Sequence, residues 1–141
     1  MTIKEKLLNI SAAFGFMIIW TMLITTFLSY AQSAQFGFNP PPTPLYLFVT
    51  ACLIAPITEE LVFRWSPLTV VKRYPVLTWP VIVISSWVFG WMHGGPTHVL
   101  IQGVFGVVFS VVYIRNGYCY WSSVFTHFLW NTTVIFFITF K

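Results

Sequence analysis

The stretch LYLFVTACLIAPITEELVFRWSPLTVV, residues 45–71, is almost wholly apolar, yet it carries two carboxylates and a guanidinium near its centre, at Glu59, Glu60 and Arg64. About 20 apolar helical residues cross a bilayer, so the stretch is long enough to span one. On insertion scales, each charged side chain at the centre of a spanning helix costs about 2.5 to 3.5 kcal/mol. The stretch therefore predicts a transmembrane helix whose charged side chains have a function that offsets this cost.

The composition on either side of this stretch indicates the same class of protein. Of the 141 residues, 57% are hydrophobic and 7% are charged, which lies far outside the range of water-soluble domains. The uncharged runs predict about five spans in one domain, residues 1–141, with spans at about 7–31, 45–71, 76–93, 97–114 and 119–140. The first run is longer than the apolar region of a signal peptide, so we interpret it as a span. We predict an all-α, polytopic transmembrane helical bundle.

The basic residues lie at the ends of the apolar runs, which is the positive-inside pattern of membrane proteins rather than a nucleic-acid-binding patch. A cytoplasmic N-terminus would leave only Lys141 outside and would put these residues on the cytoplasmic side: Lys4, Lys6, Lys72, Arg73 and Arg115. We therefore expect contact with the lipid bilayer and no nucleic-acid partner. Cys52 and Cys119 lie far apart without a CxxC motif or a histidine-rich neighbour, so we interpret both as packing residues.

The three charged residues of the quoted stretch differ in where they lie around the helix. Glu60 and Arg64 are four residues apart, so they share a face, with the acid toward the N-terminus, which is the better order for such a pair. Glu59 lies about 100° around the helix from Glu60 and is not aligned with the arginine. This predicts that Arg64 holds Glu60 ionised, while Glu59 points into the bundle as a working base. The alternative is that all three form one structural ion network.

Two later runs add polar side chains to this set. His93 ends the third run one turn after Phe89, and His127 and Asn131 share a face of the fifth. A lone histidine at a helix end is more often structural than catalytic, and His98, just past a Gly-Gly-Pro turn, is interpreted as a loop or interfacial residue. Polar side chains within spans turn toward each other rather than toward lipid. The acids, two of the histidines and the asparagine therefore predict a polar cavity shared by three spans.

The order and spacing of these residues resemble the motifs of a known family. The resemblance is carried by Glu59-Glu60-x-x-x-Arg64, Phe89-x-x-x-His93 and His127-x-x-x-Asn131. These resemble the three motifs of the CPBP family of intramembrane proteases, which includes CAAX-processing endopeptidases and bacteriocin-processing or immunity-associated relatives. The resemblance covers roughly residues 45–140, and the three motifs in order are much more specific than any one. The chain is shorter than the better-known members, so size and motifs make it most similar to small bacterial, myxosortase-like members.

This resemblance implies a glutamate-dependent endopeptidase that needs no metal or other cofactor. It implies that Glu59 and His93 bind and deprotonate the attacking water, that His127 and Asn131 stabilise the oxyanion, and that Glu60 and Arg64 support the site. The implied partner is a membrane-anchored protein or peptide, and the implied location is a prokaryotic inner membrane. Because the chain is short, we expect a minimal substrate groove or one that a second copy completes.

Two alternative functions use the same residues differently. In a non-catalytic membrane immunity or scaffolding protein, the polar cluster would only hold helices together. In a zinc hydrolase, Glu59, His93 and His127 would be ligands, since two histidines and a glutamate form a known zinc set.

Overall fold

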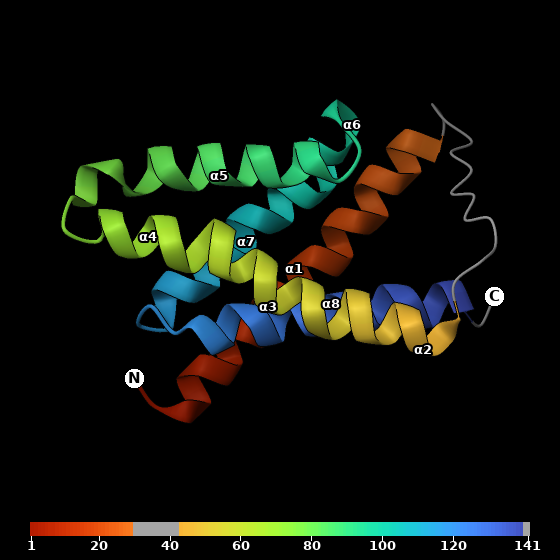
Figure 1. Ribbon diagram of the computed structural model, residues 1–141, viewed down its shortest axis with the longest axis horizontal. Coiled ribbons are helices and arrows are strands. Elements are labelled where there is room, and N and C mark those ends of the chain that lie inside the picture. The colour runs from red at the N-terminus through yellow and green to blue at the C-terminus, as the bar shows by residue number, and fades with distance from the viewer. Residues whose placement is uncertain (30–42, 140–141) are drawn as a thin grey trace.

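The computed structural model describes residues 1–29 and 43–139, and every regular element in them is a helix (Figure 1). The elements are α1 (Ile3–Ser29); α2 (Pro44–Leu47), η1 (Phe48–Ile54), α3 (Ala55–Glu60), η2 (Leu61–Trp65) and α4 (Ser66–Val71); η3 (Pro75–Leu77) and α5 (Thr78–Met92); α6 (Pro96–His98), η4 (Val99–Gly103) and α7 (Val104–Arg115); and α8 (Tyr120–Thr139). Of the short elements, η1, η2 and η4 are π-helical and η3 is a 3₁₀ turn. The predicted all-α fold is confirmed.

The first helix begins earlier than the predicted start at residue 7, because a capping box closes its N-terminus. The Glu5 N–H donates to Thr2 Oγ1 at 3.2 Å, and the Thr2 N–H donates to Glu5 Oε2 at 2.6 Å. These two backbone N–H groups have no intrahelical carbonyl to bond, and the capping box gives each of them an acceptor. The predicted end of this span near residue 31 and the proline-rich link that follows fall outside the described residues.

Four helical runs of the described chain are long and apolar enough to cross a membrane: Ile3–Thr25, Pro44–Val71, Pro75–Met92 and Pro96–Arg115. They make the chain an integral membrane protein. The fifth predicted span, α8, has 20 residues but is not among the four. Its His127, Asn131 and several hydroxyl side chains lower its mean hydropathy, so a fifth crossing stays a prediction.

The run from Pro44 to Val71 departs from regular α-helix at two places, each just before a proline. The Ala55 N–H bonds the Thr50 carbonyl and the Ser66 N–H bonds the Leu61 carbonyl, so each bond spans five residues rather than four. Pro56 and Pro67 follow directly, and neither has an N–H to continue the α-helical ladder. Short π-helical turns of this kind occur frequently at functional sites. Here they lie on either side of the two glutamates.

Glycines allow the closest approach between two runs. A Cβ added to Gly90 of α5 would lie 2.7 Å from the backbone nitrogen of Gly103 and 2.7 Å from Cα of Val99, both in η4. No side chain fits between these backbones, so the α5–η4 crossing requires a glycine at position 90. The crossing fixes the end of α5, where His93 lies, against the start of the next run.

The basic residues gather at one end of the bundle, where Figure 1 places the N-terminus, the α4–α5 turn and the α7–α8 turn. The Lys72 Nζ lies 4.5 Å from the centre of the Tyr118 ring, and Asn116 Nδ2 donates to the Lys6 carbonyl at 3.3 Å. These contacts join the turn after α4 and the start of α1 to the turn after α7, three parts of the chain that are distant in sequence. The grouping fits the predicted cytoplasmic side, whereas the orientation in the membrane stays a prediction.

Candidate active site

Glu60 and Arg64 form a fully buried ion pair. Both side chains are 0% exposed, and Arg64 Nη1 lies 3.5 Å from Glu60 Oε1. The four-residue spacing places both on one side of the run, as the sequence predicted. Inside an apolar bundle neither charge has water to solvate it, so each depends on the other.

Aromatic rings hold the Arg64 guanidinium on several sides. Its Cζ lies 4.3 Å from the ring centre of Phe89, 5.4 Å from that of Phe109 and 5.9 Å from that of Phe63. Within the described residues none of its three nitrogens makes a hydrogen bond, so the faces of these rings and Glu60 supply its favourable contacts. A Cβ on Gly106 would lie 2.8 Å from Arg64 Nη2, so α7 must carry a glycine there.

His127 of α8 connects the buried pair to the second glutamate. Its Nδ1 lies 3.0 Å from Glu60 Oε1, and its ring stacks on Phe109 with centres 4.6 Å apart and planes at 17°. An ionised carboxylate only accepts, so Nδ1 carries the proton in this hydrogen bond. The other ring nitrogen, Nε2, then faces Glu59, with Oε2 3.7 Å away.

His93, at the end of α5, also directs its Nε2 atom toward Glu59. Its Nδ1 lies 2.7 Å from the Phe89 carbonyl, and a carbonyl only accepts, so Nδ1 again carries the proton. Its Nε2 lies 3.9 Å from Glu59 Oε2. The side chains of His93 and Glu59 are 32% and 27% exposed, so this part of the cluster is open where the Glu60 part is closed.

The Glu59 Oε2 atom thus lies between two imidazole Nε2 atoms at distances too long for direct hydrogen bonds. When each ring carries its only proton on Nδ1, both Nε2 atoms have lone pairs, so the two rings and the Glu59 carboxylate all present acceptors. A water molecule that donates one hydrogen to Glu59 and one to a histidine satisfies this arrangement. Such a water is oriented for deprotonation by a carboxylate.

The described residues contain no group of three or more His, Cys, Asp or Glu side chains arranged to hold a metal ion.

Asn131 lies one turn beyond His127 and contacts the run that carries the glutamates. Its Nδ2 donates to the Ala51 carbonyl at 2.7 Å. The α-helical partner of that carbonyl, the Ala55 N–H, bonds Thr50 instead, and the π-helical partner, position 56, is a proline. Asn131 therefore satisfies a carbonyl that the helix leaves unpaired. One amide hydrogen is used in this way and the other is not.

The structure brings five of the six predicted site residues into direct contact and places Asn131 beside them. His98 lies outside this cluster, with Nδ1 3.1 Å from Gln102 Oε1. Phe109 and Gly106 also belong to the site, but an aromatic residue and a glycine in an apolar helix form no distinctive sequence pattern that would predict this. Pro56 was the one sequence signal for the role of Asn131. A proline has no backbone N–H, so a carbonyl one turn earlier needs a donor from elsewhere.

An all-helical integral membrane protein with a glutamate and two histidines meeting between its spans has the architecture expected of an intramembrane hydrolase. The family described as type II CAAX prenyl endopeptidase Rce1-like matches residues 41–133, well over half of the chain and all three motifs. The chain belongs to this family, whose general activity is CAAX-type intramembrane proteolysis. The match confirms the resemblance found in the motifs. Comparisons with curated proteins and with solved structures gave no match.

Proposed function

We propose that the protein is an intramembrane endopeptidase that uses Glu59 as the general base for an attacking water. The observation that carries this proposal is the position of Glu59 Oε2, 3.7 Å and 3.9 Å from the Nε2 atoms of His127 and His93. A general base needs to reach its water and to remain accessible to substrate. The Glu59 side chain is 27% exposed, with its Oε2 atom buried beside the two imidazoles, whereas the Glu60 side chain is 0% exposed.

The reaction proceeds by attack of the water oxygen on the scissile carbonyl carbon while Glu59 accepts one water proton. The tetrahedral intermediate then collapses, the carbon–nitrogen bond breaks, and the proton passes from Glu59 to the leaving amine. His93, fixed by its Nδ1–H bond to Phe89, orients the water through Nε2. Glu60 and Arg64 position His127 and do not touch the reacting atoms.

His127 and Asn131 are the proposed donors to the oxyanion, a role that rests on the family resemblance. Because Nδ1 of His127 is bonded to Glu60, Nε2 donates only when the ring carries a second proton. Asn131 has one remaining amide hydrogen after its bond to Ala51. An oxyanion donor contributes about 2.7 to 4 kcal/mol to catalysis.

The proposed substrate is a membrane-associated protein or peptide segment that enters the site through the open Glu59–His93 side. Family membership makes a prenylated cysteine substrate a possibility to test rather than the preferred one. A prokaryotic inner membrane, a cytoplasmic N-terminus and a second copy that completes the groove are also proposals.

A comparison of membrane proteomes tests the function. Cells with the wild-type protein and cells with Glu59→Gln are compared for a protein whose terminus is trimmed only in the first. The matched control is Glu5→Gln, the same chemical change at the only other acidic residue outside the cluster. Identical termini in all three strains, at equal protein levels, would favour the non-catalytic alternative.

Metal analysis of purified active protein tests the zinc alternative. We expect activity that chelators leave unchanged. One zinc per chain, together with loss of activity on chelation and recovery on adding zinc, would support the hydrolase with Glu59, His93 and His127 as ligands.

A further inference from the structure

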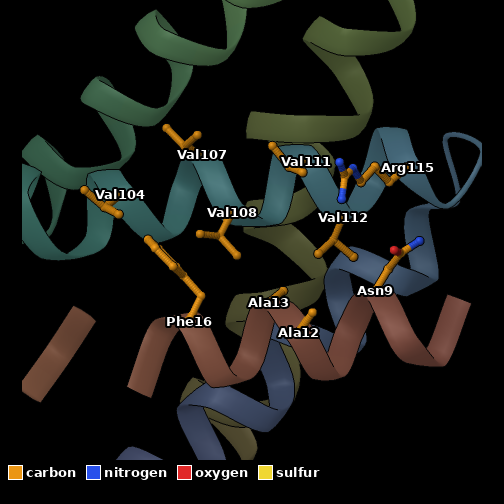
Figure 2. Close-up of a pocket in the computed structure, with 10 residues that line it drawn as sticks. All are labelled: Asn9, Ala12, Ala13, Phe16, Val104, Val107, Val108, Val111, Val112 and Arg115. Carbon is orange, nitrogen blue, oxygen red and sulfur yellow. The ribbon is translucent and has the colours of Figure 1, made fainter. Parts of the chain in front are cut away.

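A hollow of about 460 Å³ lies between α1 and α7, away from the glutamates and histidines of the candidate site (Figure 2). Its walls are Ala12, Ala13 and Phe16 from α1 and a row of valines from Val104 to Val112 from α7. On both helices the lining positions are spaced by three and four residues, so each set occupies one face. The small alanine side chains leave the space, and the groove is apolar along its length.

Only one end of the groove is polar. Asn9 and Arg115 lie there, and Figure 2 shows the Arg115 side chain beside Val112, opposite Asn9. The Asn9 amide is fixed, because Nδ2 donates to Asn116 Oδ1 at 2.7 Å. The charge at this end of the groove therefore comes from Arg115, which is exposed.

Among the described residues, no carboxylate forms an ion pair with Arg115. The three acidic residues are all described: Glu5 caps α1, and Glu59 and Glu60 lie in the candidate site with the histidines and Arg64. The same end of the bundle carries Lys6 near the start of α1 and Lys72 at the end of α4. An anion that approaches this end meets several positive charges and no negative one except Glu5.

We propose that this groove binds one molecule of an anionic phospholipid, with an acyl chain along the valines and alanines and the phosphate at Arg115. A lipid phosphate lies at the edge of the hydrocarbon region. The groove between α1 and α7 ends at the same level, in the long cationic side chain of Arg115. Basic pockets between transmembrane helices are known to hold anionic headgroups. Charge complementarity favours an anionic lipid over a zwitterionic one.

Native mass spectrometry of the full-length protein, with phosphatidylglycerol or phosphatidylcholine of the same acyl chains, tests this site. We expect the wild-type protein to retain phosphatidylglycerol about fivefold better, the ratio that about 1 kcal/mol per basic residue near the membrane surface gives. Arg115→Gln should remove this preference. The control Lys4→Gln removes the same charge at the same end of the bundle, outside the groove, and should keep it.

Ala13→Leu tests the acyl part of the proposal, because a larger side chain fills the groove. It should lower retention of both lipids while the far-ultraviolet circular dichroism of the protein stays unchanged. Equal retention of the two lipids by the wild-type protein, equal effects of Arg115→Gln and Lys4→Gln, or full retention by Ala13→Leu would each overturn the proposal. None of these outcomes depends on peptidase activity.

Discussion

Glu59 and Glu60 are neighbours in sequence, yet they lie in opposite environments. Glu60 is 0% exposed and contacts Arg64 and His127, whereas the Glu59 side chain is 27% exposed and lies between two imidazole nitrogens without a direct hydrogen bond to either. One step of about 100° along a helix separates them. The difference shows how one helix supplies both a fully buried carboxylate in an ion pair and a partly exposed carboxylate, which is the proposed base.

Substitutions in the two environments should differ in whether they mainly lower the stability of the protein or mainly lower its turnover. On the closed side, formed by Glu60, Arg64, Phe109 and His127, a substitution should lower the free energy of unfolding, and activity should fall as a consequence. On the open side, formed by Glu59 and His93, a substitution should lower turnover with little change in stability. Comparing matched variants of the two sides tests this distinction.

The largest loss of stability is expected for Glu60→Gln. It leaves the guanidinium of Arg64 in the apolar core without its carboxylate, which should cost about 3 to 5 kcal/mol of unfolding free energy. The measurement is the unfolding midpoint in detergent. Glu59→Gln is the control, since it makes the same chemical change one residue away. Equal midpoints for the two variants would contradict the distinction.

Gly106→Ala should have the next largest effect. Its Cβ would lie 2.8 Å from Arg64 Nη2 and 2.9 Å from Cβ of Ser86, so overpacking should cost about 1 to 3 kcal/mol. Gly15→Ala is the matched control, because nothing lies within 4 Å of its added Cβ. That substitution should leave stability unchanged or raise it by about 0.5 to 1 kcal/mol. Thermal unfolding of both variants in one detergent gives the comparison.

Asn131→Ala should cost about 1 to 3 kcal/mol, because the Ala51 carbonyl loses its donor in an apolar environment. Pro56→Ala restores a backbone N–H at position 56, so the double variant Pro56→Ala with Asn131→Ala should recover part of that stability. If Asn131 also donates to the oxyanion, turnover of the double variant should stay low even though its stability recovers. Recovery of both would limit Asn131 to a structural role.

Phe109→Leu should have the smallest effect on stability among the closed-side variants. It removes the ring stacked on His127. The free energy of unfolding should fall by about 0.5 to 1.5 kcal/mol in addition to the effect of the lost apolar contact. Phe105→Leu is the control, because Phe105 is also buried in α7 but packs on Trp130 at 4.6 Å. At similar stability, Phe109→Leu should lower turnover more in a peptide-cleavage assay.

The sequence predicted the parts of this site that depend on local spacing. The Glu60–Arg64 pair follows from four-residue periodicity, and the meeting of three helical runs follows from the cost of leaving polar side chains in lipid. The bond from Asn131 to Ala51, the rings around Arg64 and the link from His127 to Glu60 depend on how distant helices pack. No spacing within one helix specifies those contacts.

The most direct test of the central claim is turnover of purified Glu59→Gln on a substrate identified from the proteome comparison, measured together with its unfolding midpoint. A general base typically contributes a factor of about 10² to 10⁴, so turnover should fall by that factor. The unfolding free energy should change by less than about 1 kcal/mol, since a partly exposed side chain without a direct hydrogen-bond partner is replaced by one of the same shape. Turnover equal to that of the wild-type protein, with the midpoint unchanged, would contradict the assignment of Glu59 as the base.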